Sequence, residues 1–369
     1  MVHYVLGDIV TEISERENNP SNSSYERFVG LEHYVSGEVE IENYGSTSNL
    51  NSAMKVFKSG DILVARRNVY LKRASVVYFD GLTSGDSIVL RPKDETIGRI
   101  LPFILNTDDF WNYADQHSDG TMSKRLSPKV LKKYEFDLPE ENLEQFADTL
   151  WAMVDVKKSY QKLLKQTDEL VKSQFIEMFG DPVRNDKEWP TKPIKEVAPE
   201  TNADIPKDNE YWWLNLDMIE SYSGRLLDRV IEKSDAIGSS THPFDDSMVL
   251  YSKLRPYLNK IFVPDSYGYA TTELVALKPN PNELNKYFLF NLLRGDCFVN
   301  FANKSSSGAQ MPRMQMKVLR EFQCILPPMD LQNKFVEISE QADKSKFELK
   351  QDIEGVDVLI KSLIQQELN

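Results

Sequence analysis

Cysteine and histidine are scarce in this chain, with two and four residues among 369. Two cysteines, Cys297 and Cys324, are too few for a disulfide-stapled scaffold and fit a reducing cytosol. One disulfide is possible, but two buried free thiols are the better interpretation. The histidines and cysteines show no spacing typical of metal ligands, so we expect no metal site.

Long apolar runs are also missing. The longest, Tyr287–Leu293, has seven residues, whereas a membrane helix needs about 20. The first ten residues have neither a basic start nor a long apolar core, so no signal peptide is visible. We therefore expect a cytoplasmic protein without membrane contact.

Sequence motifs for catalysis are absent as well. The chain has no GxxxxGK[ST] or GxGxxG loop, no DPPY or NPPY motif of amino-methyltransferases and no GxSxG motif. A nuclease-like set can be forced from Asp265, Glu273 and Lys278, but the last two have the wrong spacing. We expect no catalytic residue and no cofactor in this chain, and favour a binding or scaffolding protein.

The net charge of −13 argues, at face value, against a nucleic-acid partner. Its distribution is uneven, because residues 1–42 carry −7 while residues 55–73 and 120–134 carry +5 each, and residues 297–320 carry +4. A phosphate backbone responds to charges within a Debye length of about 8–10 Å, so local basic segments matter more than the sum. Each basic segment is also consistent with a merely solvated face.

The chain repeats itself at an offset of about 188 residues. Similar segments follow one another in the same order: Leu6–Ile9 with Ile194–Val197, Ile62–Arg66 with Val249–Lys253, Ser87–Pro92 with Leu274–Pro279, Gly120 with Gly308, Lys129–Leu143 with Lys317–Leu331, and Leu170–Ser173 with Leu359–Ser362. A unit of this length is a domain plus one appended element, and is too long for a solenoid repeat. We predict a tandem duplication.

The appended element is a long helix in both copies. From Leu143 to Phe179, apolar residues recur at alternating spacings of three and four without Pro or Gly, and Gly180-Asp181-Pro182 follows as a stop. At 1.5 Å per residue, these 37 residues span roughly 55 Å. The second copy runs from Leu331 to about Leu368, with Gly355 as a possible kink. Two such stripes favour pairing of the helices with each other.

The remaining parts read as mixed α/β globules, because short β-rich runs alternate with turns and helical patterns. The sequence thus predicts an α/β (α+β) protein with two similar globules at residues 1–142 and 181–330, and helices at 143–180 and 331–369. We expect pseudo-twofold symmetry between the globules, with two antiparallel, coiled-coil-like helices separating them. Two similar globules joined by two long helices suggest a caliper, and the basic loops, one in each globule, suggest that its target is duplex DNA.

The segment KSQFIEMFGDPVRNDKEWP, Lys172–Pro190, resembles the central junction of the specificity (S) subunit of type I restriction-modification systems. Leu138-Pro139 and Leu326-Pro327-Pro328, each between a basic run and a long helix, extend the resemblance, as does the polar loop with glycine before each. The resemblance covers the whole chain, since these motifs follow one another in the expected order.

This resemblance implies that each globule is a target recognition domain that reads one half of a bipartite DNA sequence. The helices would set the spacer and dock methyltransferase (M) subunits. Those subunits bind S-adenosylmethionine and methylate adenine, while restriction (R) subunits add ATP- and Mg-dependent translocation and cleavage. The S subunit itself is not catalytic.

We expect DNA contacts from basic and polar side chains in two groups within each globule. Residues after paired strands suit phosphate contacts, and residues of the polar loops suit base edges, since Arg matches guanine and Gln matches adenine. The predicted DNA-binding residues are Arg66, Arg67, Lys72, Arg73, Thr121, Ser123, Lys124, Arg125, Lys253, Arg255, Asn303, Lys304, Gln310 and Arg313.

Two other classes stay open. A coiled-coil adaptor, or a decoy or regulatory specificity protein, would share the helices and the acidity, whereas an enzyme is disfavoured by the missing motifs. The sequence gives neither the target bases nor the spacer length.

Overall fold

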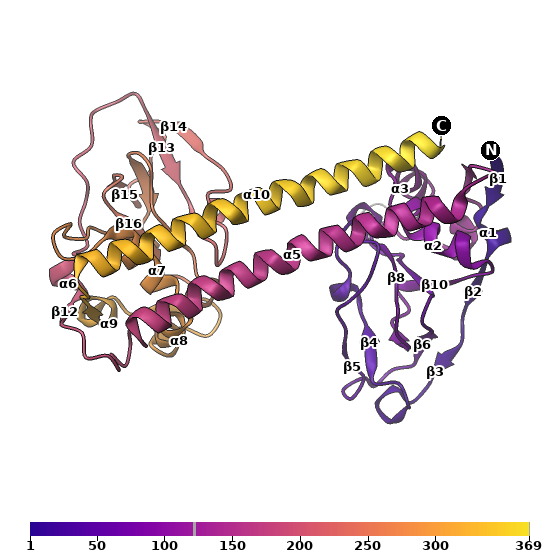
Figure 1. The fold of residues 1–369 in the computed structure, drawn as a ribbon, viewed down its shortest axis with the longest axis horizontal. Helices are drawn as coiled ribbons and strands as arrows, with labels where there is room; N and C mark the ends of the chain where they lie inside the picture. Colours follow the sequence, from indigo (N-terminus) through magenta and orange to yellow (C-terminus); the bar gives the residue numbers. More distant parts are fainter. Residues whose placement is uncertain (121–122, 369) are drawn as a thin grey trace. The chain divides into compact units, whose positions relative to one another are not determined.

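The computed structural model describes residues 1–120 and 123–368, which divide into two units. Unit 1 combines residues 1–161 with the segment from residue 350 onward, and unit 2 comprises residues 162–349. Figure 1 labels their helices and strands. Both units are mixed α/β, the fold class that the sequence predicts.

Unit 1 begins with strands and continues into short helices before the first long one. Its elements are β1 (Val2–Val5), α1 (Leu6–Ile9), β2 (Val10–Ile13), β3 (Arg16–Glu17), β4 (Arg27–Val29), β5 (Gly45–Ser46), β6 (Met54–Phe57), β7 (Ile62–Ala65), β8 (Ala74–Val76), β9 (Gly81–Thr83), β10 (Ser87–Pro92), α2 (Glu95–Ile104), α3 (Asp108–Gln116), α4 (Pro128–Leu131), β11 (Glu135–Leu138) and the start of α5 (Leu143–Phe179).

Unit 2 follows the same plan. Its elements are β12 (Thr191–Pro193), α6 (Ile194–Val197), β13 (Glu210–Leu214), β14 (Val230–Lys233), β15 (Thr241–Phe244), β16 (Val249–Ser252), β17 (Ile261–Phe262), β18 (Gly268–Thr271), β19 (Leu274–Leu277), α7 (Lys286–Arg294), α8 (Asp296–Lys304), β20 (Ser306–Ser307), β21 (Arg313–Met314), α9 (Met316–Glu321), β22 (Gln323–Ile325) and the start of α10 (Met329–Leu368).

The internal repeat is visible in the strand orders. Unit 1 contains the order β6-β9-β4-β5, and unit 2 contains β15-β18-β13-β14, each with one parallel pair, β4 with β9 and β13 with β18. The second sheets correspond too, as β10-β7-β8 and β19-β16-β17. Strands β2 and β3 of unit 1 join these sheets without a counterpart strand in unit 2 among the described residues.

Helix α5 has the bounds that the sequence predicts, because no Gly or Pro interrupts it. It ends at Gly180, which has φ of +74° and leaves no room for a side chain. A Cβ atom there would lie 1.9 Å from Oδ1 of Asp186, the oxygen that accepts the Asp181 amide. Helix α10 starts two residues earlier than predicted and continues through Gly355.

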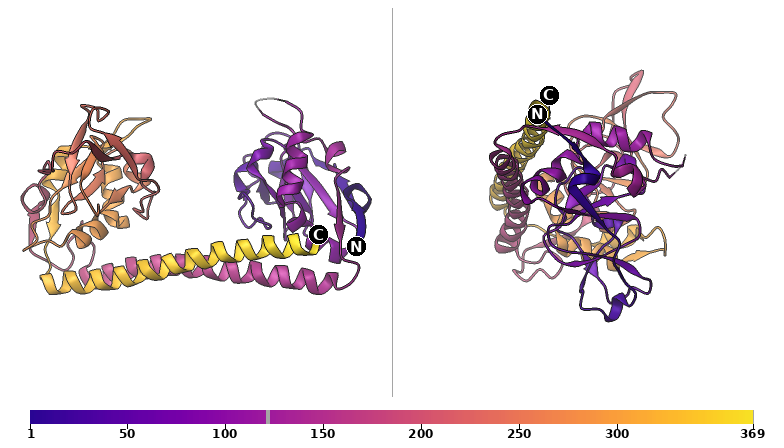
Figure 2. Two further views of the ribbon diagram at one scale, coloured as in Figure 1. Left: turned by 90° about the horizontal axis from the view of Figure 1, so that it is seen from above. Right: turned by 90° about the vertical axis from the view of Figure 1, so that its right-hand side faces the viewer.

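The long helices pack against each other within each unit. In unit 1, Lys157 Nζ lies 2.7 Å from Asp357 Oδ1 and 2.8 Å from Glu38 Oε1. Burial opposes the charge of Lys157, but these two carboxylates outweigh it and raise the pKa of the ammonium. In unit 2, Lys346 Nζ lies 2.8 Å from Asp168 Oδ1. Figure 2 shows the end of α10 lying along the start of α5 in unit 1.

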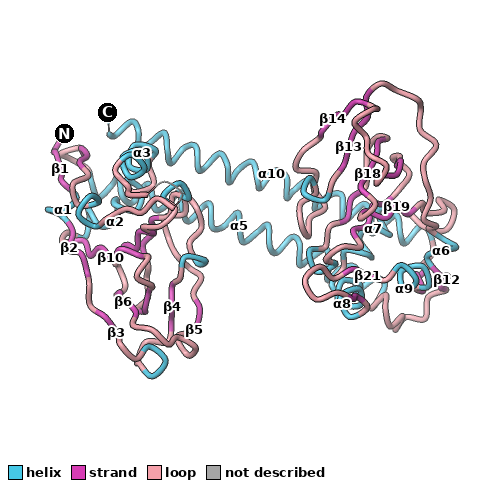
Figure 3. The backbone as a smooth tube through the Cα atoms, turned by 180° about the vertical axis from the view of Figure 1, so that it is seen from behind, coloured by secondary structure: helices cyan, strands magenta, loops and turns pink. Residues whose placement is uncertain are grey.

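Each unit has two apolar cores. One lies between its sheets, and the other joins a sheet to the short helices and to the long ones. In unit 1, the second core includes Phe103 of α2, Phe110 of α3, Leu150 of α5 and Ile364 of α10. Figure 3 shows α2 and α3 on the side of the unit 1 strands nearer to the long helices. The long helices are therefore structural parts of each globule.

The start of the segment Lys172–Pro190, which carries the family resemblance, packs into the core of unit 2. Phe175 and Phe179 of α5 meet Phe288 of α7 and Phe335 of α10 with ring centroids 4.9–5.6 Å apart. Aromatic pairs in such arrangements add roughly 0.5–1.5 kcal/mol each to the effect of burial. The F-x-x-x-F spacing of the motif thus anchors α5 in the core of unit 2.

Both cysteines are free thiols, but only Cys324 is buried, so the expectation of two buried thiols is half right. Cys297 is half-buried. Among the described residues, no helix is both long and apolar enough to cross a membrane.

Candidate nucleic-acid interface

A tight turn follows β7 in unit 1 and carries four of the predicted DNA contacts. Residues Val69–Leu71 form one 3₁₀ turn, flanked by Asn68 and Lys72, which have φ of 56° and 46°. Left-handed backbone is unfavourable for a residue with a side chain, and such strain is concentrated at functional sites. Arg66 and Arg67 precede this turn, and Arg73 follows it.

The polar loop of unit 1 is hydrogen-bonded to this turn. The Asn68 amide donates to the Lys124 carbonyl over 3.0 Å, and the Leu126 amide donates to the Arg66 carbonyl over 2.8 Å. Arg67 and Arg125 form an isolated antiparallel bridge. The two groups of residues that the sequence predicts separately therefore form a single site, which we call the turn–loop site (residues 66–73, 119–120 and 123–125). Thr121 lies outside the described residues.

One carboxylate joins the arginines of this site. Asp86, in the loop between β9 and β10, accepts a hydrogen bond from Arg125 Nη2 at 2.9 Å. Arg67 Nη1 lies 3.9 Å from the other oxygen of Asp86. Ser123 connects the loop to the turn, because its hydroxyl accepts from Arg67 Nε and donates to the Asn68 side-chain oxygen.

Unit 2 contains the same arrangement at residues 253–260 and 306–313. Arg255 and Asn259, with φ of 49° and 47°, flank the 3₁₀ turn Pro256–Leu258. The Arg255 amide donates to the Pro312 carbonyl over 2.7 Å, and the Met314 amide donates to the Lys253 carbonyl over 2.8 Å. These bonds correspond to those of unit 1 at offsets of 187 and 188, so the repeat extends to the backbone of the site.

A carboxylate holds the loop arginine here as well. Glu273 lies between β18 and β19, and its Oε1 accepts from Arg313 Nη2 at 2.8 Å while its Oε2 accepts from Arg313 Nε at 3.2 Å. This bidentate pairing raises the pKa of the Arg313 guanidinium further above its usual value. The backbone of Glu273 is tied to the turn, since the Lys253 amide donates to its carbonyl at 3.1 Å.

The other predicted contacts differ in how free their side chains are. Lys72 pairs with Asp108 at 2.5 Å, and Lys124 pairs with Asp115 at 2.6 Å. The Arg73 guanidinium donates to two backbone carbonyls, and burial lowers its pKa. Lys304, at the end of α8, and Gln310, in the loop, are exposed. Asn303 and Lys253 are half-buried.

Asp86 and Glu273 are the site residues that the sequence analysis does not place there. The signal was available, because each acid directly precedes a strand of the repeated pair Ser87–Pro92 and Leu274–Pro279. Glu273 was considered only as a nuclease carboxylate. In the structure, Glu273 instead forms a bidentate ion pair with Arg313.

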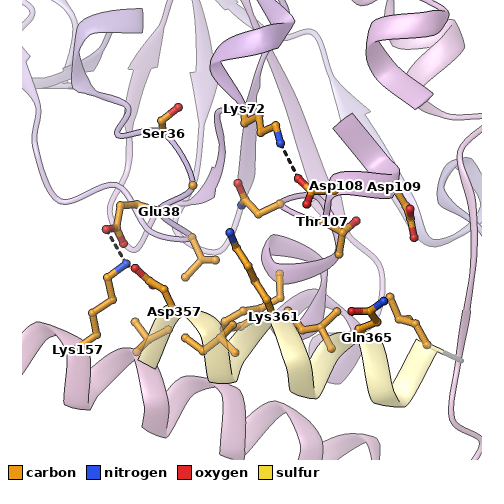
Figure 4. A pocket seen from close by; sticks show the side chains of 18 residues that line it. Ser36, Glu38, Lys72, Thr107, Asp108, Asp109, Lys157, Asp357, Lys361 and Gln365 are labelled. Atoms are coloured by element: carbon orange, nitrogen blue, oxygen red, sulfur yellow. Dashed lines mark hydrogen bonds and ion pairs between the residues drawn. The ribbon is translucent and has the colours of Figure 1, made fainter. Parts of the chain in front are cut away.

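A cavity of about 450 Å³ lies in unit 1 and has Lys72 of the turn–loop site in its lining. Its floor is apolar, with Val39, Phe103 and Ile364 among the residues that line it. Figure 4 shows Lys72 reaching Asp108 and Lys157 reaching Glu38 around this cavity. Acidic and basic side chains both line the cavity. In the part of the chain that the structure describes, no cluster of His, Cys, Asp or Glu residues is suited to hold a metal ion.

Comparisons with known proteins agree with the resemblance seen in the sequence. Residues 186–355 match the family model described as the type I restriction modification DNA specificity domain. The specificity subunit of the type I restriction enzyme EcoDI from Escherichia coli is 27% identical over 123 residues. That match spans 33% of this chain and only 27% of the EcoDI subunit.

Two solved structures share the fold along the whole chain. The type I restriction-modification S subunit from M. genitalium has a TM-score of 0.55 at 14% identity, and the match covers all of this chain and 96% of that one. A chain from a structural study of complex assembly and conformational transition in a type I R-M system has a TM-score of 0.57 at 18% identity, with coverage of 100% and 97%. At these identities, the likeness concerns the fold alone.

Proposed function

We propose that this chain, which belongs to the type I restriction-modification specificity family, is the DNA-reading subunit of such a system in the cytoplasm. Each unit reads one half of a bipartite duplex target. The chain itself is not catalytic and carries no cofactor. M subunits supply S-adenosylmethionine and adenine methylation, and R subunits supply ATP- and Mg-dependent cleavage.

The observation that carries this proposal is the turn–loop site in duplicate. Two sites with the same backbone hydrogen bonds, the same left-handed flanks and the same acid–arginine pair are suited to two half-sites of one target. Differing side chains at equivalent positions, such as Arg67 and Leu254, would give the two half-sites different sequences. The matched strand orders within the two units support the duplication and the domain limits 1–142 and 181–330.

The acidity of the chain is compatible with this role. DNA affinity depends on cations close to phosphate, and acids beyond a Debye length are screened. Lys304 and Gln310 remain exposed at one site, and Arg67 is exposed at the other. Basic surfaces of partner subunits would add to the field.

The long helices offer surfaces for such partners. In unit 2, Leu163, Leu170 and Phe347 are exposed, and in unit 1 Val358 and Leu359 are exposed. Exposed large apolar side chains on helices mark protein contacts when they gather on one surface. We assign them to docking of M subunits. A coiled-coil adaptor would also explain these side chains, but it gives no reason for two turn–loop sites.

The test is selection from a pool of random-sequence duplexes with the full chain, alone and co-expressed with a type I M subunit. We expect enrichment of two short sequences at a fixed separation. Replacement of both Arg66 and Arg67 by Ala should weaken binding to all duplexes and lower the salt slope by about two. The matched control is Lys192→Ala with Lys195→Ala, two exposed lysines of unit 2 outside the site. Enrichment of no sequence by the wild-type chain would favour the adaptor.

A further inference from the structure

We propose that Glu273 and Asp86 are positioning residues for DNA reading, each holding the loop arginine of its unit in a fixed orientation towards a base edge. This inference rests on the proposed function and extends it to residues that act through another side chain. It starts from the hydrogen bonds that the two acids make.

Glu273 occupies one edge of the Arg313 guanidinium and leaves another edge open. A guanidinium has five N–H donors in a planar fork. Nε and Nη2 point to Glu273, so both hydrogens of Nη1 and one of Nη2 remain. Those donors form the end-on pair that matches O6 and N7 of guanine. The ion pair thus fixes the plane of the fork without using the donors that read the base.

The acid is itself held by the backbone. Glu273 lies in the short connection between two strands, and its carbonyl accepts the Lys253 amide. Asp86 has the same setting in unit 1, where its carbonyl accepts the Arg66 amide at 2.9 Å. These backbone hydrogen bonds, directly before a strand, restrict the main chain of each acid, so the acid can in turn orient the arginine that it pairs with.

The two units use the acid differently. Glu273 pairs with one arginine, whose Nε and Nη2 both donate to it, whereas Asp86 contacts Arg125 at 2.9 Å and Arg67 at 3.9 Å. The unit 1 pair is monodentate, and the fork of Arg125 is less constrained there. We therefore expect a stronger effect on base choice from a change at Glu273 than from one at Asp86.

A carboxylate on a DNA-reading surface costs affinity, because it repels phosphate. A free Arg313 would bind phosphate at any sequence, with no discrimination between bases. Pairing with Glu273 reduces this non-specific attraction and keeps the fork for a base edge. The acid thus favours specificity over affinity.

The decisive experiment is duplex selection with full-length wild type and Glu273→Gln. We expect Gln to keep the side-chain shape but to release the fork of Arg313. Preference for guanine at one position of one half-site should fall about tenfold. The other half-site should be unchanged, while non-specific affinity rises and the salt slope steepens by about one.

Three further variants serve as controls for this experiment. Glu321→Gln removes an exposed acid that pairs with Lys195, and should leave the selected motif unchanged. Glu273→Asp keeps the charge and should restore most of the preference. Arg313→Lys keeps a cation beside Glu273 but has no fork, so it should lose the preference even if Glu273→Gln proves unstable.

The outcomes separate the two proposals. If wild type selects a bipartite motif and Glu273→Gln selects the same motif with the same discrimination, Glu273 is no positioning residue. A uniform gain in affinity without altered base choice would make it a simple repulsive charge and also overturn the proposal. If wild type selects no motif, the proposed function fails first.

Discussion

Several basic side chains of the turn–loop sites are paired with acids of their own unit. Arg125, Lys124, Lys72 and Arg313 each have a carboxylate within 2.9 Å. Exposed pairs of this kind contribute little to stability, typically below about 1 kcal/mol. If these residues contact DNA as proposed, DNA can compete for the cations at small cost, and the pairs act mainly on orientation.

The pair of Lys72 and Asp108 gives a prediction for pH. The hydrogen bond from Lys72 holds the pKa of Asp108 below its ordinary value. Since the folded pKa is lower than the unfolded one, any stability from this pair is complete above the unfolded pKa of about 4. It is lost as pH falls through the folded pKa. We expect Lys72→Met to return the Asp108 pKa upward, as measured by carboxyl ¹³C NMR titration.

The control for this titration is Lys129→Met, which removes an exposed lysine of α4. It should leave the Asp108 titration unchanged. Equal curves for wild type and Lys72→Met would show that the two side chains do not pair in solution.

The sequence indicates most of the basic residues of the site, but not which acids they pair with. Arg66, Arg67 and Arg125 stood out as basic residues in basic segments. The repeat marks the position of Asp86 beside a strand but not its pairing with Arg125, because the two residues meet only in the folded unit. Charge segments seen along the chain are thus a poor guide to the charge that DNA meets.

At the scale of elements, the left-handed turns have an energetic cost that the proposed DNA binding would explain. Arg255 and Lys72 occupy left-handed backbone, which costs a side-chain-bearing residue roughly 1–2 kcal/mol. The Nε of Arg255 is also buried without a hydrogen-bond partner in the structure. Such features persist where the side chain is needed for binding.

We therefore predict that Arg255→Gly stabilises the protein and weakens DNA binding. Glycine relieves the strain, and after its own entropy cost the free energy of unfolding should rise by up to about 1 kcal/mol. Urea unfolding and duplex binding of the full chain measure the two effects. Tyr257→Gly, inside the same turn, is the control and should only destabilise. A less stable Arg255→Gly chain with full DNA affinity would contradict this explanation.

The elements differ in how well the sequence reveals them. Helix α5 was predicted to the residue, since the lack of Gly and Pro and the Gly180 stop are local signals. The left-handed turns were not predicted, because Arg255 and Lys72 are unusual residues for such backbone. Strand order was also out of reach, since the parallel pair of β13 and β18 joins residues more than 50 positions apart.

At the scale of the whole molecule, helix length should set the spacer between half-sites. Both long helices pass from one unit to the other, at residues 161–162 of α5 and 349–350 of α10. Insertion of four helix-compatible residues after Gln161 and four after Leu349 leaves the contacts within each unit intact. The added turn is roughly 6 Å, or about two base pairs.

We expect this double insertion to lengthen the spacer while both half-sites keep their sequences. Motif selection from random duplexes is the measurement. The control is the same insertion in α5 alone, which should lower the stability of the protein. With only one helix lengthened, the two helices lose their register, so the ion pair between Asp168 and Lys346 and the packing of Phe175 on Phe335 can no longer form together with the contacts in unit 1. An unchanged spacer in a stable, DNA-binding double variant would rule out the helices as a ruler.

Completion of unit 1 by α10 has a consequence for synthesis on the ribosome. Ile364 is buried in the core of unit 1, and Ile360, Leu363 and Leu368 pack against it. These residues are translated only after the 188 residues of unit 2, which takes about 10–40 s at ordinary elongation rates. During that interval the apolar face of unit 1 that α10 covers stays exposed on the nascent chain. Unit 2 is one continuous segment, so all of its residues have been synthesised before the end of α10. Chaperone engagement during translation should therefore concentrate on the earlier-made unit.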